Sequence, residues 1–319
     1  MKISVLGCGR WGSFHAWYAD RLGHETLLWG RPGSARLEAL RATRHNDYLD
    51  LPPSVTLTDD LTTALSGCDL CIIAISAQQL RAFAGDLKRT GVSLAMPFIL
   101  CMKGLEIGSG KRLTTVMREV LGPRVRVAVW VGPGHVQDFV QGMPNCMLMA
   151  SEDGTLTRQL VAALDGPLIR FYYGRDLLGI EVGAAAKNVM GIAAGMLDGL
   201  HLSSLKGSLM ARGTHELSVL IATLGGDAQT VYGLSHLGDY EATLFSAHSH
   251  NRRFGEDFIL GRAFDKLAEG VYTTKALLDL SAQVGVELPI TRAIQAIVAE
   301  DADPRQELEK LFLRATKTE

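Results

Sequence analysis

The chain has 319 residues, 47% of them hydrophobic, so it can bury a large core and exceeds the usual length of a single domain. Its 32 basic and 34 acidic side chains give a formal net charge of −2, which offers no electrostatic footprint for nucleic acid or an anionic membrane. Nothing at the N-terminus resembles a signal peptide, and no apolar stretch is expected to reach membrane-spanning length. We therefore expect a two-domain cytoplasmic enzyme.

The first predicted elements are a strand, a glycine-rich turn and a helix. An apolar strand over residues 2–6 runs into Gly7-Cys8-Gly9-Arg10-Trp11-Gly12, which opens a helical pattern that continues through Leu22. A second strand is predicted over residues 25–29. This is the G-x-G-x-x-G pattern of dinucleotide-binding folds, with a strand before it and a helix after it.

Each glycine of this turn has a physical role in holding a dinucleotide. Gly7 allows the tight turn, Gly9 lets the backbone approach a pyrophosphate, and Gly12 allows the helix to pack closely on the strand. The amides at the helix N-terminus then favour phosphate groups. The pattern predicts a nicotinamide dinucleotide site in preference to a purely structural turn.

The segment after the second strand bears on the choice of cofactor. Sites specific for NAD usually place a carboxylate there for the ribose 2′-hydroxyl, whereas this chain reads Trp29-Gly30-Arg31-Pro32-Gly33. Arg31 can accept a 2′-phosphate, or it can be a solvated loop residue. The sequence therefore favours NADP(H) slightly over NAD(H).

Strand and helix patterns alternate through the rest of the first half. Apolar runs over residues 70–75, 98–102, 125–131 and 146–150 predict buried strands, and a last run covers residues 168–173. This alternation predicts a parallel, doubly wound sheet. The five cysteines lie mostly in apolar runs, and the pair Cys68 and Cys71 lacks a second ligand pair, so we expect reduced core thiols and no metal site.

The character of the chain changes near Asp176. Beyond it the sequence is rich in Ala, Leu and Gly at helical spacing and shows no convincing strand, while Pro289 opens a late helix toward Glu300. The fold class expected is α/β, with an N-terminal doubly wound Rossmann-type domain over residues 1–177. A mostly α-helical domain over residues 178–319 should carry the substrate and the catalytic groups.

A single lysine, Lys187, stands inside a small and apolar helical run over residues 182–195. Its neighbours three and four positions away include Gly183 and Gly191, so its helix face has room for a substrate. Burial lowers the pKa of an ammonium, which makes a buried lysine usable as a proton donor and acceptor. The alternative is that Lys187 reaches solvent from the edge of the helix.

Further polar clusters support a role for Lys187 in an active site. The group Gly238-Asp239-Tyr240 follows a glycine-rich turn, and the run from Ser249 to Gly255 contains Ser, His, Asn and Arg. A carboxylate near Lys187 would control its charge, and the second cluster offers donors to an anionic group. Each cluster alone is compatible with a solvated loop. Together with Lys103-Gly104 at the end of a predicted strand, they indicate an active site.

In number and order these motifs resemble those of bacterial NAD(P)-dependent glycerol-3-phosphate dehydrogenases. The resemblance runs from the first strand to Leu288-Pro289-Ile290 and so covers nearly the whole chain. It rests on Gly7-Cys8-Gly9-Arg10-Trp11-Gly12, Lys103-Gly104-Leu105-Glu106, Gly132-Pro133, Gly179-Ile180-Glu181, Ala186-Lys187-Asn188-Val189, Arg212-Gly213, Gly238-Asp239, Asn251-Arg252-Arg253-Phe254-Gly255 and Glu269-Gly270.

The resemblance implies a reaction and a role for each matched residue. The reaction is reversible hydride transfer between NAD(P)H and dihydroxyacetone phosphate, which gives sn-glycerol 3-phosphate, a phospholipid precursor. Lys187 is then the catalytic acid and base, and Lys103 and Asp239 complete the catalytic group. The implied cofactor-binding residues are Gly7, Gly9, Arg10, Trp11, Gly12, Arg31, Lys103, Val136 and Glu269. The implied substrate-binding residues are Lys103, Gly132, Gly134, Lys187, Asn188, Asp239, Ser249, His250 and Asn251.

The chain departs from the family pattern at three positions. His250 stands where the family usually has an arginine, Gly134 where it has a hydroxyl residue, and Ser204 near a usual asparagine. An arginine makes two parallel charged bonds to a phosphate, whereas a neutral histidine makes one. Either Arg252 or Arg253 can compensate, or they pair with acids.

Two other functions remain open. The first is a diverged paralogue that reduces another small 2-oxo or phosphorylated substrate, and His250 and Gly134 support it. The second is a non-catalytic NAD(P)-binding regulatory protein, which the joint presence of Lys103, Lys187 and Asp239 disfavours. The expected partner is a small phosphorylated three-carbon substrate, and a homodimer remains open.

Overall fold

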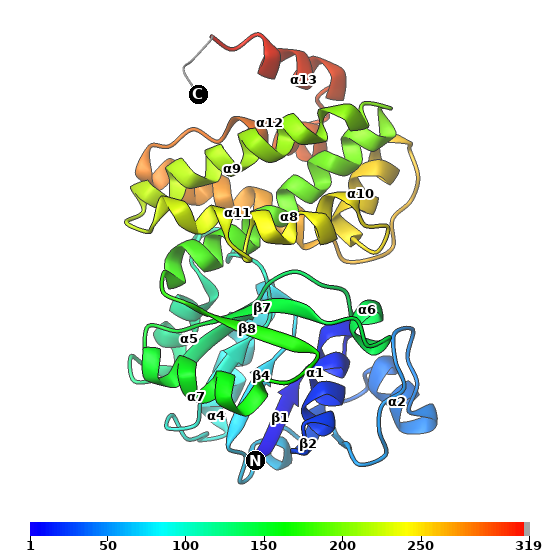
Figure 1. Ribbon diagram of the computed structural model, residues 1–319, viewed down its shortest axis with the longest axis vertical. Coiled ribbons are helices and arrows are strands. Elements are labelled where there is room, and N and C mark those ends of the chain that lie inside the picture. The colour runs from blue at the N-terminus through cyan, green and yellow to red at the C-terminus, as the bar shows by residue number, and fades with distance from the viewer. Residues whose placement is uncertain (316–319) are drawn as a thin grey trace. The chain divides into compact units, whose positions relative to one another are not determined.

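The computed structural model describes residues 1–315, which divide into two units (Figure 1). The first unit comprises Met1–Met102 and Leu113–Leu177, and the second comprises Lys103–Arg112 together with the chain from Leu178 onward. The predicted division at residue 177 differs from these units in the segment Lys103–Arg112. Leu105 of this segment is fully buried in the apolar core of the second unit, a long-range contact that local sequence patterns do not report.

An eight-stranded sheet forms the centre of the first unit. The strand order is β3-β2-β1-β4-β5-β6-β7-β8, and the order reverses direction between β1 and β4, where open sheets of this kind bind ligands. The strands are β1 (Lys2–Leu6), β2 (Glu25–Trp29), β3 (Thr56–Thr58), β4 (Leu70–Ile73), β5 (Phe98–Leu100), β6 (Val127–Val131), β7 (Asn145–Ala150) and β8 (Ile169–Gly174). The expected Rossmann-type fold is confirmed.

The expectation of a wholly parallel sheet is wrong at one junction, because β7 runs antiparallel to β6. The connection between them holds only the five-residue helix α6 (Val136–Val140). A parallel crossover normally needs a dozen or more residues with a helix that carries the chain back along the sheet. The longer helix α7 (Gly154–Leu164) does so, and β8 is parallel to β7.

The remaining helices of the first unit follow the predicted alternation. The glycine-rich turn leads directly into α1, whose inner side packs Phe14 and His15 against Trp130 and Phe139. The helices are α1 (Arg10–Arg21), α2 (Ala35–Thr43), α3 (Leu61–Leu65), the 3-10 turn η1 (Ala77–Gln79), α4 (Leu80–Arg89) and α5 (Leu113–Leu121).

The second unit is helical, as expected. Its central helix is α8 (Leu177–Gly199), followed by η2 (Ser203–Leu205), α9 (Lys206–Thr223), η3 (Ala228–Tyr232) and η4 (Leu237–Asp239). The π-helical turn η5 (Glu241–Phe245), α10 (His250–Ile259), α11 (Glu269–Val284), α12 (Pro289–Ala299) and α13 (Pro304–Phe312) complete it. Pro289 occupies the start of α12, as the sequence predicts.

The expectation that no apolar stretch reaches membrane-spanning length is wrong for α8. Its 23 residues are long and apolar enough by length and composition, with a mean hydropathy of 1.3 over the 18-residue window. However, 94% of that window is buried inside the protein. Such burial is typical of the core helix of a folded domain.

Glycines let α8 and α10 meet at backbone distance. A Cβ added to Gly195 would lie 1.8 Å from the carbonyl oxygen of Arg252, and one added to Gly255 would lie 2.1 Å from that of Ile192. No side chain fits between the two helices at these points. The packing therefore fixes the N-terminal end of α10 against the middle of α8.

His15 on α1 gives the first unit a pH-dependent contribution to stability. The ring is 1% exposed, lies against Trp11 and Trp130, and neither of its nitrogens has a hydrogen-bond partner in the described chain. Burial lowers the pKa of His15 from 6.5 to about 3.

We expect the free energy of unfolding to fall as the pH is lowered below about 6.5, because the unfolded chain then protonates His15 while the folded chain does not until about pH 3. The slope attributable to His15 is at most about 1.4 kcal/mol per pH unit. Urea denaturation between pH 7 and 4 should show this slope in the wild type and its loss in His15→Leu. An equal slope in both proteins would assign the effect to other groups.

Candidate active site

Lys187 lies in the middle of α8 and is 8% exposed, so it does not reach solvent from the helix edge. Its Nζ donates a hydrogen bond of 2.7 Å to Thr243 Oγ1 and lies 3.2 Å from Asp239 Oδ2. A buried ammonium needs such partners, because it has lost its hydration. The small residues of the helix, rather than a path to water, explain why the lysine fits here.

Lys103 shares the same carboxylate. Its Nζ donates to Asp239 Oδ2 at 2.6 Å, and the Asp239 side chain is 1% exposed. Two ammonium groups therefore meet one buried carboxylate, which leaves one positive charge in excess. The three residues predicted to be catalytic are brought together, and their excess charge favours an anionic or electron-rich ligand.

The segment Lys103–Arg112 is held to α8 at both of its ends. Asn188 Nδ2 donates to the carbonyl oxygen of Lys103 at 3.0 Å. At the other end, Arg112 Nη1 donates to Glu181 Oε2 at 2.9 Å. Asn188, predicted as a substrate-binding residue, thus fixes the backbone of the residue that carries the second ammonium.

Thr243 was not among the predicted site residues. Its hydroxyl donates to the carbonyl oxygen of Asp239 at 2.6 Å, so its lone pairs face the ammonium of Lys187. Thr243 lies in the π-helical turn η5, and a turn of this rare type has no sequence signature. The only signal in the sequence is its spacing of four residues from Asp239.

The predicted anion-binding residues Ser249, His250 and Asn251 form the start of α10. Ser249 caps the helix by accepting from the amide of Arg252 at 3.3 Å, and Asn251 Oδ1 accepts from the amide of Gly270 at 2.9 Å. A Cβ on Gly191 would meet Thr243 Cγ2 at 2.8 Å and Asn251 Cβ at 3.2 Å. The start of α10 therefore lies beside α8, one turn beyond Lys187, and a helix N-terminus favours anions.

Arg252 pairs with acids and does not replace the family arginine. It donates to Asp198 Oδ2 and Glu256 Oε2, both at 2.8 Å, and to the carbonyl oxygen of Ser246 at 3.1 Å. Lys206 reaches the same oxygen of Asp198 at 2.7 Å. Arg253 is exposed on the far side of the helix.

The glycine-rich turn of the first unit fits a dinucleotide. Gly7 has φ +118°, and a Cβ on it would lie 2.3 Å from the carbonyl oxygen of Ala74. A Cβ on Gly12 would lie 1.6 Å from the carbonyl oxygen of Gly7, so the helix meets the turn at backbone contact. The N-cap residue Gly9 has no side chain to occupy the first amides of α1, which suits a pyrophosphate there.

The other predicted cofactor residues differ in exposure. Arg31 is exposed after β2, Val136 is buried, and Trp11 packs against His15. Arg10 stacks over Tyr48, and burial lowers the pKa of its guanidinium. Arg36, which no sequence motif indicated, has its Nη1 3.7 Å from where a Cβ on Gly9 would lie.

Glu269 belongs to the second unit, where it is the first residue of α11. A Cβ on the adjacent Gly270 would lie 2.7 Å from the carbonyl oxygen of Asn188. The start of α11 therefore packs against α8 beside Lys187. Among the described residues, no group of three or more His, Cys, Asp or Glu side chains is placed to hold a metal ion, and all five cysteines are free thiols.

Comparison with known families agrees with this geometry. The model of the N-terminus of NAD-dependent glycerol-3-phosphate dehydrogenase matches residues 2–157, and the model of its C-terminus matches residues 176–309. The chain belongs to the NAD-dependent glycerol-3-phosphate dehydrogenase family.

Relatives match over their full length. A glycerol-3-phosphate dehydrogenase of the NAD(P)+ type from Paucimonas lemoignei is 37% identical over 335 residues, which cover 100% of this chain and 98% of the relative. One from Thermus thermophilus is 37% identical over 330 residues and 100% of both chains. The family expected from the motifs and the nicotinamide cofactor class are confirmed.

Solved structures show the same architecture. Glycerol-3-phosphate dehydrogenase from Coxiella burnetii superimposes with a TM-score of 0.90 at 28% identity, covering 98% of this chain and 99% of that one. A 2-dehydropantoate 2-reductase from Methylococcus capsulatus has a TM-score of 0.63 at 16% identity over 99% of both chains, a likeness of fold alone. The expected α/β and helical halves are thus those of the family.

The three positions that depart from the family pattern lie in different parts of the structure. Gly132 and Gly134 have φ +139° and +135°, and a Cβ on Gly134 would lie 2.5 Å from the ring of Phe139. A hydroxyl residue therefore does not fit at Gly134 unless Phe139 moves. Ser204 is exposed in η2, and His250 is half-buried at the first position of α10.

Proposed function

We propose that this chain catalyses reversible hydride transfer between NAD(P)H and dihydroxyacetone phosphate, giving sn-glycerol 3-phosphate. The observation that carries the proposal is the buried group of Lys103, Asp239 and Lys187, in a chain whose full-length relatives are named for this activity. The product would supply phospholipid synthesis. Purified protein should oxidise NADPH when dihydroxyacetone phosphate is added, and a panel of 2-oxo acids should be turned over more slowly.

In this mechanism Lys187 is the general acid. The glycine-rich turn Gly7–Gly12 would hold a nicotinamide cofactor, which would supply a hydride for the C2 carbonyl carbon. Lys187 gives one of its ammonium protons to the carbonyl oxygen, forming the C2 hydroxyl. The neutral amine is then reprotonated from water. In the reverse direction the same amine accepts the hydroxyl proton.

The neighbours of Lys187 stabilise its ammonium form and fix the position of the amine. Asp239 stabilises the ammonium form, and Thr243 accepts one of its hydrogens, which fixes the amine against α8. Lys103, whose Nζ contacts the same Oδ2 of Asp239 as Lys187 does, stabilises negative charge that develops on the carbonyl oxygen. No metal ion is required for this step because the lysines polarise the carbonyl.

We assign the substrate phosphate to the start of α10. The helix N-terminus offers amides and a favourable dipole, and Ser249, His250 and Asn251 add side chains there. Because Arg252 is bound to two carboxylates, we assign the phosphate contact at this helix start to His250 rather than to Arg252. Histidine in place of the family's arginine at position 250 also supports a second candidate function, that of a diverged paralogue that acts on a different small 2-oxo compound.

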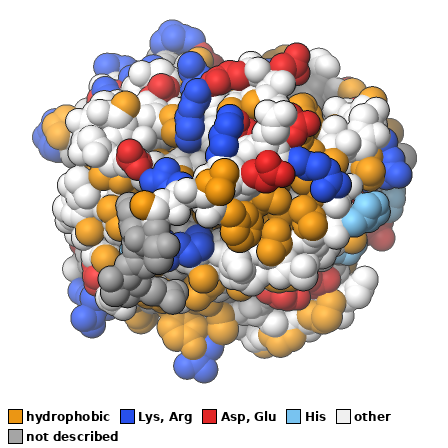
Figure 2. All heavy atoms as spheres, turned by 90° about the horizontal axis from the view of Figure 1, so that it is seen from above, with side chains coloured by type: hydrophobic (Ala, Val, Ile, Leu, Met, Phe, Trp, Pro, Cys, Tyr) orange, Lys and Arg blue, Asp and Glu red, His pale blue; other side chains and the backbone are white. Residues whose placement is uncertain are grey.

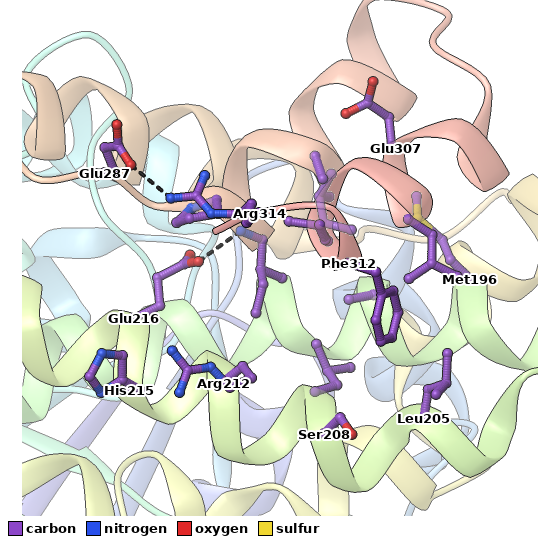
Figure 3. Close-up of a pocket in the computed structure, with 18 of the residues that line it drawn as sticks. Met196, Leu205, Ser208, Arg212, His215, Glu216, Glu287, Glu307, Phe312 and Arg314 are labelled. Atoms are coloured by element: carbon purple, nitrogen blue, oxygen red, sulfur yellow. Dashed lines mark hydrogen bonds and ion pairs between the residues drawn. The ribbon is translucent and has the colours of Figure 1, made fainter. Parts of the chain in front are cut away.

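We also propose that the chain forms a homodimer through the helical face seen in Figure 2, where hydrophobic side chains gather among charged ones. A hollow of about 790 Å³ opens there, lined largely by apolar side chains of α8, α9, α12 and α13 (Figure 3). Phe312 and Leu313 beside it are 66% and 83% exposed. Exposed apolar patches of this kind support association with a second copy. Light scattering should give twice 34.5 kDa, and Phe312→Glu should lower that mass.

We further propose that the enzyme works in the cytoplasm. The free thiols of all five cysteines and a net charge near zero support a reducing aqueous compartment. Fractionation of expressing cells should recover the protein with cytosolic markers.

We expect Lys187→Ala and the longer, apolar Lys187→Met to lower kcat by about 10²–10⁴, since that is the usual contribution of general acid–base catalysis. NADPH binding, followed by fluorescence titration, should stay within twofold of the wild type, because the lysine acts on the substrate oxygen. Lys275→Ala, at an exposed lysine of α11, is the matched control. A folded Lys187 variant with more than about a tenth of wild-type kcat would exclude Lys187 as the proton donor.

The cofactor assignment predicts that Arg31→Ala raises KM for NADPH by about tenfold and leaves KM for NADH unchanged, because only NADPH carries the 2′-phosphate. Arg36→Ala is the comparison variant, since Arg36 lies beside Gly9 and should affect both cofactors alike. A selective rise in KM for NADPH in the Arg36 variant would instead assign the 2′-phosphate to that residue. A wild type that strongly prefers NADH would contradict any 2′-phosphate site.

The substrate assignment predicts that His250→Arg lowers KM for dihydroxyacetone phosphate by about tenfold, because a bidentate charged contact replaces a single one. If wild-type His250 binds as a histidinium, its KM should also rise as the pH increases through about 6.5, and the arginine variant should lack this rise. His248→Arg, two positions away and exposed, controls for added charge. If His250→Arg leaves KM for dihydroxyacetone phosphate unchanged at every pH, and the protein turns over a non-phosphorylated 2-oxo compound faster, the diverged paralogue is favoured.

A further inference from the structure

A second buried histidine, His236, lies next to the catalytic group and is used by none of the steps above. It is fully buried and immediately precedes η4, the turn that carries Asp239. Its Nδ1 lies 2.9 Å from the carbonyl oxygen of Gly183, and its Nε2 lies 2.7 Å from the hydroxyl of Tyr240, which is itself fully buried.

These two contacts fix the protonation of the ring. A carbonyl oxygen can only accept, so Nδ1 carries the hydrogen and donates to Gly183. Nε2 is then the acceptor for the hydroxyl hydrogen of Tyr240. Burial lowers the pKa of His236 to about 4, which agrees with a neutral ring. A neutral ring adds no positive charge beside Lys187.

The bond to Gly183 connects the two elements that carry the catalytic pair. In a regular α-helix the carbonyl of Gly183 accepts the backbone amide of Lys187, four residues later. The donor in the ring of His236 therefore reaches the helix one turn from the catalytic lysine. Gly183 permits the approach, because a Cβ on it would lie 3.2 Å from His236 Cβ.

Tyr240 links His236 to Thr243, the other side chain that contacts Lys187. The backbone amide of Asp239 donates to the carbonyl oxygen of His236 at 3.0 Å, and the amide of Thr243 donates to that of Tyr240 at 3.0 Å. His236 and Tyr240 thus stand at the two ends of the short stretch that presents Asp239. Displacing the ring would move Asp239 and Thr243 together, away from α8.

We propose that His236 and Tyr240 are a positioning pair that holds Asp239 against Lys187 and so sets the pH range over which Lys187 retains its transferable proton. The inference rests on the proposed role of Lys187 as the proton donor. The charged groups that act on the His236 ring are Asp239 and Lys187, Lys103 shares the Asp239 carboxylate, and Glu216 of α9 acts on Tyr240.

Two amide replacements separate the two bonds of His236. The amide nitrogen of His236→Asn takes the place of Nδ1 and keeps the donor to Gly183, whereas the amide of the longer His236→Gln takes the place of Nε2 and loses that donor. Tyr240→Phe removes the hydroxyl alone. Tyr18→Phe is the matched control, because Tyr18 is also buried but its hydroxyl donates to the carbonyl oxygen of Leu164 in the first unit.

We expect the alkaline limb of kcat for carbonyl reduction to move to lower pH by about one unit in His236→Gln, since an ammonium that loses a nearby carboxylate gives up its proton more easily. Tyr240→Phe should move it less in the same direction. His236→Asn, which keeps the donor to Gly183 but loses the acceptor for Tyr240, should move it no more than Tyr240→Phe does, and KM for dihydroxyacetone phosphate should change less than kcat. Tyr18→Phe should lower Tm without moving the profile.

A measurement without turnover separates this inference from the proposed function. The Cε resonances of ¹³C-labelled lysine, with Lys187 assigned by Lys187→Met, report its titration in the free protein. The titration midpoint of Lys187 should be lower in His236→Gln than in the wild type and His236→Asn. Equal midpoints in all three proteins would overturn the positioning role, even if the enzyme is active. The predicted shift in a protein that does not reduce dihydroxyacetone phosphate would support the positioning role and reject the proposed substrate.

Discussion

One buried carboxylate organises the second unit. Asp239 is shared by Lys103 and Lys187, which come from segments far apart in the sequence, and each ammonium lies within 3.2 Å of the same oxygen. Burying three charges is costly unless they compensate one another, so removing Asp239 would leave two unpaired cations in a poorly hydrated place. The requirement explains why the segment Lys103–Arg112 leaves the sheet domain and packs on α8, where Asn188 and Glu181 secure its two ends.

Close backbone packing makes this charge arrangement rigid. Along α8, Gly183 admits His236, Gly191 admits Thr243 and Asn251, and Gly195 admits the backbone of α10. A side chain at any of these positions would separate α8 from the elements packed against it. The absence of bulk around the lysine lets the neighbouring elements approach closely, and at Gly183 and Gly191 they fill the room that the sequence suggested for a substrate.

The sequence predicts those features that depend on local spacing. The glycine-rich turn, the strand after it and the proline at the start of α12 each follow from residues near one another in the chain. The polar clusters suggested a carboxylate near Lys187, and the order of the motifs, which resembles that of a family, gave Asp239 its role. Features that depend on distant contacts were missed, namely the antiparallel β7, the transfer of Lys103–Arg112 to the second unit, and the role of Thr243 in a π-helical turn. The expectation that no apolar stretch is long enough to span a membrane missed the length of α8, whose burial inside the protein depends on distant contacts.

Contacts made locally at the start of α10 explain how the chain can carry histidine at the first position of this helix. The amides and dipole of the helix N-terminus attract an anion whatever side chain stands there, and Ser249 and Asn251 are fixed by their own hydrogen bonds to the backbone. On the assignment proposed above, the side chain at 250 adjusts the strength and geometry of anion binding at this helix start. Lys187, Asp239 and Thr243 are held to one another by their own hydrogen bonds and ion pair on α8, η4 and η5. We propose that substrate preference varies at α10 while Lys187, Asp239 and Thr243 keep their arrangement.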